Sequence, residues 1–228
     1  MLRECSMEDI SDGRTYELND MVKCDTGDCK DCHKCCTGMG ASIVLDSYDI
    51  WRLKCGLSLS FEEMLNKGFI ELNMVDGLIL PNLKMSEKDA CSFLDENGRC
   101  SIHKERPGVC RLFPLGRVYE DNGFKYFVQK GQCVNENKLA KIKVKKWIDT
   151  DNLSKNQAYI LKWHDFIRHI GDKMIKLRDS GKGDMLNEIA MYVLNEFFVK
   201  DFDKDTDIYN VITDKIDEAY KNIDTLAG

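Results

Sequence analysis

The chain has 228 residues, a formal net charge of −6, and 39 acidic against 33 basic side chains. A chain of this length can bury a hydrophobic core without covalent cross-links. The negative charge and the lack of a long basic block argue against nucleic acid as a partner, because phosphate binding depends on lysine and arginine. Because a chain of this length does not need disulfides to fold, its 11 cysteines must have another role than cross-linking a small fold.

The first 20 residues are rich in acidic side chains and hold no apolar run of the length that a secretion signal requires. Elsewhere the apolar runs are far shorter than the ~20 residues that span a bilayer. We therefore expect a cytoplasmic protein with no membrane partner. Thiols stay reduced in the cytoplasm, so clustered cysteines there indicate metal binding or catalysis and not disulfides.

In the N-terminal half, short helices and strands alternate. Residues 42–45 have the pattern of a short strand, and residues 47–55 that of a helix ended by Gly56. Ser60 and Glu63 have the spacing of a capping box, which predicts the start of a further helix.

Two hairpins are predicted between these helices and the end of the cysteine-rich part. Asp76-Gly77 joins two alternating apolar segments, residues 70–75 and 78–83. This dipeptide is a strong signal for a tight β-turn. A second hairpin is predicted within residues 118–128, around Asp-Asn-Gly.

From Lys138 onward, apolar residues recur with helical spacing. We predict an α+β fold: a small cysteine-rich metal-binding domain with short hairpins and helices, followed by a C-terminal helical bundle. The predicted helices cover residues 139–148, 159–170, 185–198 and 208–220. The predicted divisions of the chain are an N-terminal extension at 1–23, the cysteine-cluster domain at 24–137 and the helical region at 138–228.

The first cysteine group reads Cys29-x-x-Cys32-x-x-Cys35-Cys36. A two-residue gap lets both sulfurs of a turn reach one metal ion, so two overlapping gaps indicate metal ligation. Cys35 and Cys36 are adjacent, and successive side chains of an extended backbone point to opposite sides. We therefore expect them to face different metal centres or to flank one polynuclear cluster.

A second cysteine group, Cys91, Cys100, Cys110 and Cys133, supplies four more thiols. Four plus four thiolates would suit two four-ligand sites. Isolated cysteines are common in hydrophobic cores, and we assign Cys5 and Cys55 to that class. For Cys24 both interpretations stay open.

Thiolates are soft ligands, which suit Zn²⁺ and iron–sulfur clusters alike, so spacing alone leaves the metal open. The second group also holds Arg106-Pro107 and Arg111. Proline restricts the backbone of this loop. The arginines either offset the charge of the thiolates and bind an anionic cofactor, or are ordinary surface side chains.

The run Cys-x-x-Cys-x-x-Cys-Cys, followed by Arg106-Pro107, Cys110-Arg111 and Phe113-Pro114, resembles the YkgJ-type cysteine cluster family, a zinc- or iron-chelating domain. The resemblance covers about residues 29–133. It implies the following metal ligands: Cys29, Cys32, Cys35, Cys36, Cys91, Cys100, Cys110 and Cys133. One departure is His103, which stands where the family often has tyrosine and which we expect to be exposed or to contact a ligand.

A similar cysteine cluster occurs in the flagellin lysine-N-methylase, so the resemblance implies two functions. The first is a metal-binding protein that holds one or two iron–sulfur clusters of the 4Fe-4S type, or zinc. The second is an S-adenosylmethionine-dependent methylase with a protein substrate; no Gly-rich nucleotide loop supports it. A third, a zinc-ribbon binder of nucleic acid, conflicts with the net charge. The basic residues 141–146 alternate with Ile142 and Val144, and we expect them to form a solvated amphipathic face.

Overall fold

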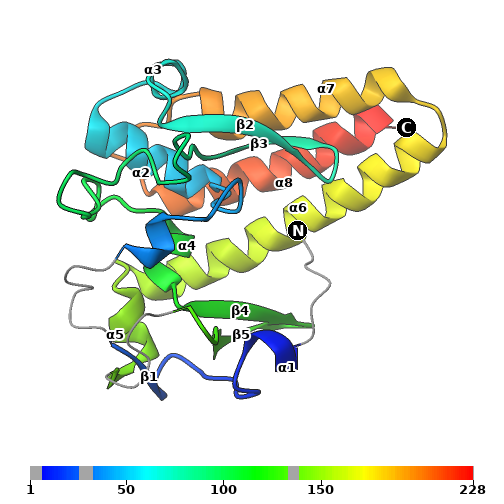
Figure 1. Ribbon diagram of the computed structural model, residues 1–228. Coiled ribbons are helices and arrows are strands. Elements are labelled where there is room, and N and C mark those ends of the chain that lie inside the picture. Colours follow the sequence, from blue (N-terminus) through cyan, green and yellow to red (C-terminus); the bar gives the residue numbers. More distant parts are fainter. Residues whose placement is uncertain (1–6, 26–32, 133–138, 228) are drawn as a thin grey trace. The chain divides into compact units, whose positions relative to one another are not determined.

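The computed structural model describes residues 7–25, 33–132 and 139–227 (Figure 1). Over these ranges the fold is α+β, as predicted, and its strands form two-stranded antiparallel sheets. The chain divides into two compact units, each built from two separate segments. The hairpin–helix unit holds Ala41–Lys84 and Ser154–Gly228, and the cysteine unit holds Leu2–Gly40 and Met85–Leu153. Each unit combines segments that are far apart in the sequence. The predicted divisions, in contrast, are continuous stretches of the chain that differ in composition.

The hairpin–helix unit combines a hairpin with two short helices and a C-terminal helical region. The C-terminal helical region was predicted, and it is confirmed. Over the described ranges, none of the helices combines the length and the apolar character needed to cross a bilayer. The elements of this unit are α2 (Ser47–Leu57), α3 (Phe61–Asn66), β2 (Ile70–Val75), β3 (Leu78–Leu83), α6 (Leu153–Asp179), α7 (Gly183–Leu194), the π-helical turn η3 (Asn195–Val199) and α8 (Ile208–Ala227).

The hairpin of β2 and β3 forms in the predicted register, with Val75 opposite Leu78. The turn residues Asp76 and Gly77 have φ angles of 51° and 85°. Two consecutive positive φ values are typical of the type I′ turn, whose twist matches that of the flanking strands. The expected strand at 42–45 is reduced to a single bridge between Val44 and Asn82 of β3.

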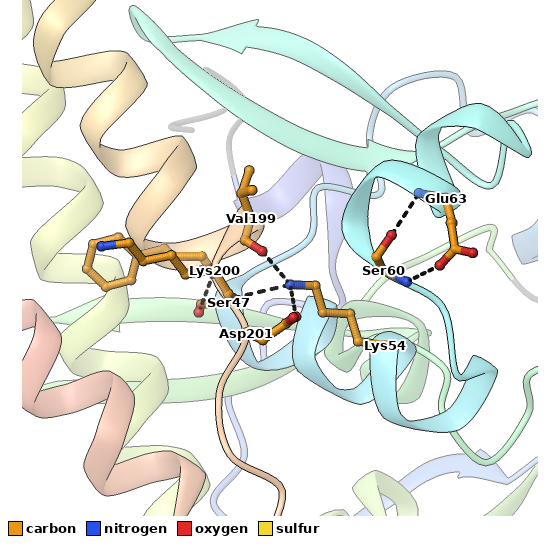
Figure 2. Close-up of polar contacts among 8 residues, drawn as sticks. Ser47, Lys54, Ser60, Glu63, Val199, Lys200 and Asp201 are labelled. Atoms are coloured by element: carbon orange, nitrogen blue, oxygen red, sulfur yellow. Dashed lines mark hydrogen bonds and ion pairs between the residues drawn. The ribbon is translucent and has the colours of Figure 1, made fainter.

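Both short helices of this unit begin with a capping box. Ser60 and Glu63 exchange side-chain and backbone hydrogen bonds at the start of α3, as predicted (Figure 2). Asp46 does the same at the start of α2. Helix α2 continues past Gly56, where an end was expected, and stops at Leu57, because the next residue adopts the left-handed conformation.

Lys54 of α2 stabilises the far end of the π-helical turn. Its Nζ donates hydrogen bonds to the carbonyl oxygens of Val199 (2.8 Å) and Lys200 (3.2 Å) and pairs with Asp201 Oδ1 at 2.9 Å (Figure 2). The Lys54 side chain is only 10 % exposed. Because the last carbonyls of a helical segment have no partner within it, this ammonium group acts as a C-terminal cap.

The cysteine unit holds shorter elements around a small hydrophobic core. That core includes Cys24, which is fully buried among apolar side chains such as Val22, Leu115 and Tyr126. The elements are α1 (Met7–Ile10), β1 (Met21–Asp25), the 3₁₀ turn η1 (Lys34–Cys36), α4 (Gly108–Leu112), β4 (Leu115–Glu120), β5 (Gly123–Val128), β6 (Ala140–Lys143) and α5 (Val144–Ile148).

The sequence prediction was wrong at the start of the expected C-terminal helices. Residues 139–148 were assigned to one helix, but β6 is a strand that pairs antiparallel with β1, and only α5 is helical. The alternation of lysine with Ile142 has the period of two that a strand requires. Ile142 pairs with the buried Val22 of β1, a strand that crosses the predicted boundary between the N-terminal extension and the cysteine-cluster domain.

Candidate metal centre

Cys35 and Cys36 lie in the 3₁₀ turn η1 and not in an extended segment. Their Sγ atoms are 4.0 Å apart and share a weak hydrogen bond. The premise that the two side chains point to opposite sides is therefore wrong, because a tight helical turn brings neighbouring side chains closer together than a strand does. The sequence left two arrangements open: the two sulfurs face different metal centres, or they flank one polynuclear cluster. The short distance between the two sulfurs fits the second arrangement.

Backbone pairing joins the first cysteine group to the second. The amide of Cys91 donates a hydrogen bond of 2.7 Å to the carbonyl oxygen of Cys36. Thr37 and Ala90 form the adjacent antiparallel bridge, and the amide of Gly38 donates to the carbonyl of Asp89 at 2.8 Å. Segments more than 50 positions apart in the sequence are thereby held side by side. No motif in the sequence predicted this pairing.

Cys100 is brought back toward Cys91 by a tight turn. Leu94 and Cys100 form a bridge, and Asp95 Oδ1 accepts hydrogen bonds from the backbone amides of Asn97 and Arg99. In the sequence, this turn lies between the two cysteines. Its side-chain hydrogen bonds are typical of aspartate at the first position of a turn.

The turn also contacts the first cysteine group through Gly98. Gly98 has a φ of 70°, and a Cβ atom placed there would lie 3.0 Å from Nδ1 of His33. The left-handed backbone favours glycine at this position, and a Cβ atom there would also require the imidazole to shift. His33 itself is exposed.

Mutual electrostatic effects link four thiols of this unit. The hydrogen bond from Cys36 lowers the pKa of Cys35 to about 7, against the effect of burial. The same hydrogen bond and burial raise the pKa of Cys36, and the charges of Cys91 and Cys100 raise it further. Burial raises the pKa of Cys91 and of Cys100 as well, and the Cys35 charge adds to both shifts. A negative charge on one sulfur thus opposes charge on the others.

Two backbone amides favour the thiolate form at the second cysteine group. Phe93 donates a backbone hydrogen bond to the thiol of Cys91, and Ile102 donates one to that of Cys100; each lowers the thiol pKa. In both cases the donor lies two residues after the cysteine. Amides that point at sulfur hold it in place and stabilise its negative charge, as the surroundings of metal-bound thiolates do.

Arg106 and Arg111 have different surroundings. The Arg106 guanidinium acts on the thiols, since its charge lowers the pKa of Cys35 and of Cys100. Arg111 instead donates to backbone carbonyls, from Nε to Arg106 at 3.2 Å, from Nη1 to Asp149 at 2.6 Å and from Nη2 to Lys104. Its fork of donors thereby holds the loop that carries Arg106. Both were predicted to bind a cofactor, and that role stays a prediction.

The remaining predicted ligands are distributed as follows. Cys110 lies partly buried in α4 of the same unit. Cys29, Cys32 and Cys133 lie outside the described residues, as does Cys5. Lys34 Nζ donates a 2.6 Å hydrogen bond to the carbonyl of Gly131, two positions before Cys133 in the sequence. Cys55 belongs to the hairpin–helix unit.

The donor chemistry of the site is that of sulfur. Over residues 7–25, 33–132 and 139–227, no three side chains of histidine, cysteine, aspartate or glutamate are arranged to hold one metal ion. The thiols of Cys35, Cys36, Cys91 and Cys100 are nevertheless free, partly buried and electrostatically coupled. A cation among them would offset the burial and the like charge that raise the pKa values of Cys36, Cys91 and Cys100. Such a donor set fits zinc or iron and does not fit the oxygen-preferring Ca²⁺ and Mg²⁺.

Comparison with known protein families gives the same chemistry. Residues 28–133 match the model of the CxxCxxCC family, whose description reads "Putative zinc- or iron-chelating domain". Residues 28–133 are thus similar to the CxxCxxCC domain. The match covers both cysteine groups, from before Cys29 to Cys133, and supports metal chelation by this domain. It does not extend to lysine methylation, which stays a prediction. No curated protein and no solved structure matches the chain.

Proposed function

We propose that the CxxCxxCC domain of this protein holds an iron–sulfur cluster through cysteine thiolates. The observation that carries the proposal is the joining of the two cysteine groups, with the Cys36 carbonyl bonded to the Cys91 amide and four thiols in one electrostatic neighbourhood. The proposed ligands are the eight cysteines at positions 29, 32, 35, 36, 91, 100, 110 and 133. Metal chelation is what the family match supports, and the cluster type is the further step.

Several features favour a polynuclear cluster over a single zinc ion. The Sγ atoms of Cys35 and Cys36 lie 4.0 Å apart, and the charges of Cys91 and Cys100 act on the Cys36 thiol. With the three cysteines outside the described residues and Cys110, the domain offers more sulfurs than the four that one tetrahedral zinc ion accepts. A reducing, cytoplasmic location is part of the proposal, because thiolates must stay reduced to bind a cluster. When bound, such a cluster supplies one-electron chemistry.

Anaerobic purification tests the proposal directly. We expect brown protein that contains iron and acid-labile sulfide and absorbs broadly at roughly 400 nm until dithionite bleaches it. Colourless protein with stoichiometric zinc would show that the site is a zinc site and would overturn the cluster assignment.

Cysteine substitutions test the ligand assignment. Cys32→Ala and Cys110→Ala should each remove most of the bound metal and destabilise the cysteine unit, because the binding energy of a structural metal is also folding energy. Cys55→Ala is the matched control, since this cysteine is partly buried but lies in the other unit. Loss of metal in the control, or full retention in both test variants, would contradict the assignment.

A further inference from the structure

The two-stranded sheet of β1 and β6 has one buried and one exposed face. Val22 and Cys24 of β1 are fully buried in the core. The alternate residues, Met21 and Lys23 on β1 and Lys141 and Lys143 on β6, are exposed, with Met21 opposite Lys143 and Lys23 opposite Lys141. Helix α5 follows β6 directly and adds two more exposed lysines. We call this surface the lysine face: Met21, Lys23, Lys141, Lys143, Lys145 and Lys146.

Within the part of the chain that the structure describes, none of the five lysines of this face forms an ion pair. The ion pairs of that part involve other basic side chains, on the helices α2, α6 and α8, at Lys200 directly after η3, and on β5. Lys23 and Lys141 stand directly opposite each other across the two strands. Like charges in this position destabilise a sheet. Lys23, Lys141 and Lys143 share one face of the sheet, and the exposed Lys145 and Lys146 follow directly in the chain, so the five lysines form a local positive cluster on a chain whose net charge is −6.

We propose that the lysine face docks an acidic protein surface. Complementary charge speeds the encounter of two proteins and orients them, and weak, transient complexes need only a small interface. Met21, which is 50 % exposed between the lysines, supplies an apolar centre for such a contact. This interaction does not depend on which metal the cysteines bind.

Nucleic acid fits the same surface less well. The lysine face contains no arginine for bidentate phosphate or guanine contacts and no exposed aromatic ring on which a base could stack. The nearest aromatic side chain in the sequence, Trp147, is partly buried, and its Nε1 donates to the carbonyls of Leu112 and Phe113. Lysines on open strand edges also prevent unwanted sheet pairing, but that role does not account for Lys145 and Lys146, which lie in a helix.

The test compares two variants with the same net charge. In the face variant, Lys23, Lys141, Lys143, Lys145 and Lys146 are replaced by glutamine. In the control variant, five exposed lysines from elsewhere are replaced by glutamine: Lys67, Lys84, Lys88, Lys182 and Lys204. The probe is a fluorescein-labelled glutamate-rich peptide, and its binding is followed by fluorescence anisotropy at low salt and at physiological salt.

The face variant should bind the peptide at least about tenfold more weakly than the unchanged protein, whereas the control should differ by less than about twofold. Binding by the unchanged protein should weaken as salt rises. Equal losses in both variants, or no binding by the unchanged protein, would overturn the proposal. Tighter binding of a single-stranded oligonucleotide or of vesicles with anionic lipid, at equal probe charge, would also overturn it. If the face variant does not fold, the double variant Lys141→Gln/Lys143→Gln replaces it, with an expected loss of at least about threefold.

Discussion

The backbone amide of Cys91 donates a 2.7 Å hydrogen bond to the carbonyl oxygen of Cys36. One residue of this pair belongs to the first cysteine group and the other to the second. The hydrogen bond fixes their backbones next to each other through the fold of the chain itself. Metal binding then has to order less of the chain than it would if the two groups came together only around the ion.

Because Gly98 lies close to His33, adding a single methyl group at position 98 should lower the free energy of unfolding. Gly98→Ala should lower the free energy of unfolding by about 1–2 kcal/mol from the left-handed backbone alone, and by more because the new Cβ meets the imidazole. It should also weaken metal binding, since the turn leads to Cys100. Chemical denaturation and metal titration measure the two effects.

Gly13→Ala is the control for that prediction. Gly13 has a similar φ of 75° and nothing within 4 Å of the position of its Cβ, so it carries the backbone strain without the collision. Adding His33→Ala to Gly98→Ala should recover the extra loss. If both glycine variants lose the same stability and the double variant recovers nothing, the close approach of His33 has no energetic role.

Replacing Arg111 should mainly lower stability, whereas replacing Arg106 should mainly change the pH dependence of metal uptake. Arg111→Met removes donors to three backbone carbonyls and should lower the free energy of unfolding by about 2 kcal/mol, at roughly 1 kcal/mol for each hydrogen bond and with part of the loss replaced by water. Arg106→Gln should change stability less, but should shift metal uptake to higher pH, because its charge favours the thiolates of Cys35 and Cys100. Denaturation and pH-dependent metal titration separate the two results. If metal uptake shifts in Arg111→Met but not in Arg106→Gln, the roles given to the two arginines are wrong.

Metal affinity should depend on pH with a definite sign. Cys36, Cys91 and Cys100 have raised thiol pKa values in the metal-free fold, so protons compete with the metal. The apparent affinity should rise by about tenfold per pH unit for each proton that the metal displaces. Competition with a chromophoric chelator between about pH 6.5 and 8.5 measures this slope. A flat profile would mean that the thiols are not the ligands.

The same shifts predict the opposite trend for the stability of the metal-free protein. A thiol whose pKa is higher in the folded than in the unfolded chain adds stability below its unfolded pKa, about 8.5, and loses it as pH rises through the folded value. Cys35, with its lowered pKa, works against this trend, but three of the four thiols follow it. Metal-free protein should therefore unfold at lower denaturant concentration above about pH 9 than at neutral pH.

Lys54 should be important for the hairpin–helix unit and not for the metal. Lys54→Met leaves the carbonyls of Val199 and Lys200 without their donor and should lower the free energy of unfolding by about 2–3 kcal/mol, because hydrogen bonds to a charged group are the stronger kind. Metal content should not change. Asp201→Asn is the control: this carboxylate is 82 % exposed, and an exposed ion pair contributes about 0–1 kcal/mol. Equal losses in the two variants would show that the ion pair and not the cap is what stabilises this end.

Local sequence signals determined much of the secondary structure. The capping box of Ser60 and Glu63 and the turn at Asp76-Gly77 were predicted because each depends on side chains within a few residues of one another. The CxxCxxCC motif likewise identified metal chelation from spacing alone. The assignment of residues 139–148 to one helix was wrong, because the choice between helix and strand there depends on pairing with β1, which lies more than 100 residues earlier in the chain.

The tertiary structure decided which of the sequence features act together. In the fold, the backbone of Cys36 lies next to that of Cys91, and the lysines of β1 and β6 lie on one face of their sheet. The Arg106 charge acts on the thiols, whereas the Arg111 side chain donates hydrogen bonds to the backbone. The physical reason is the same in each case. A spacing rule describes what a short segment can do, but backbone pairing between distant segments decides which side chains become neighbours, and charge interactions depend on that distance. The sequence thus determined the sulfur chemistry, and the fold determined which thiols are coupled and which arginine acts on them.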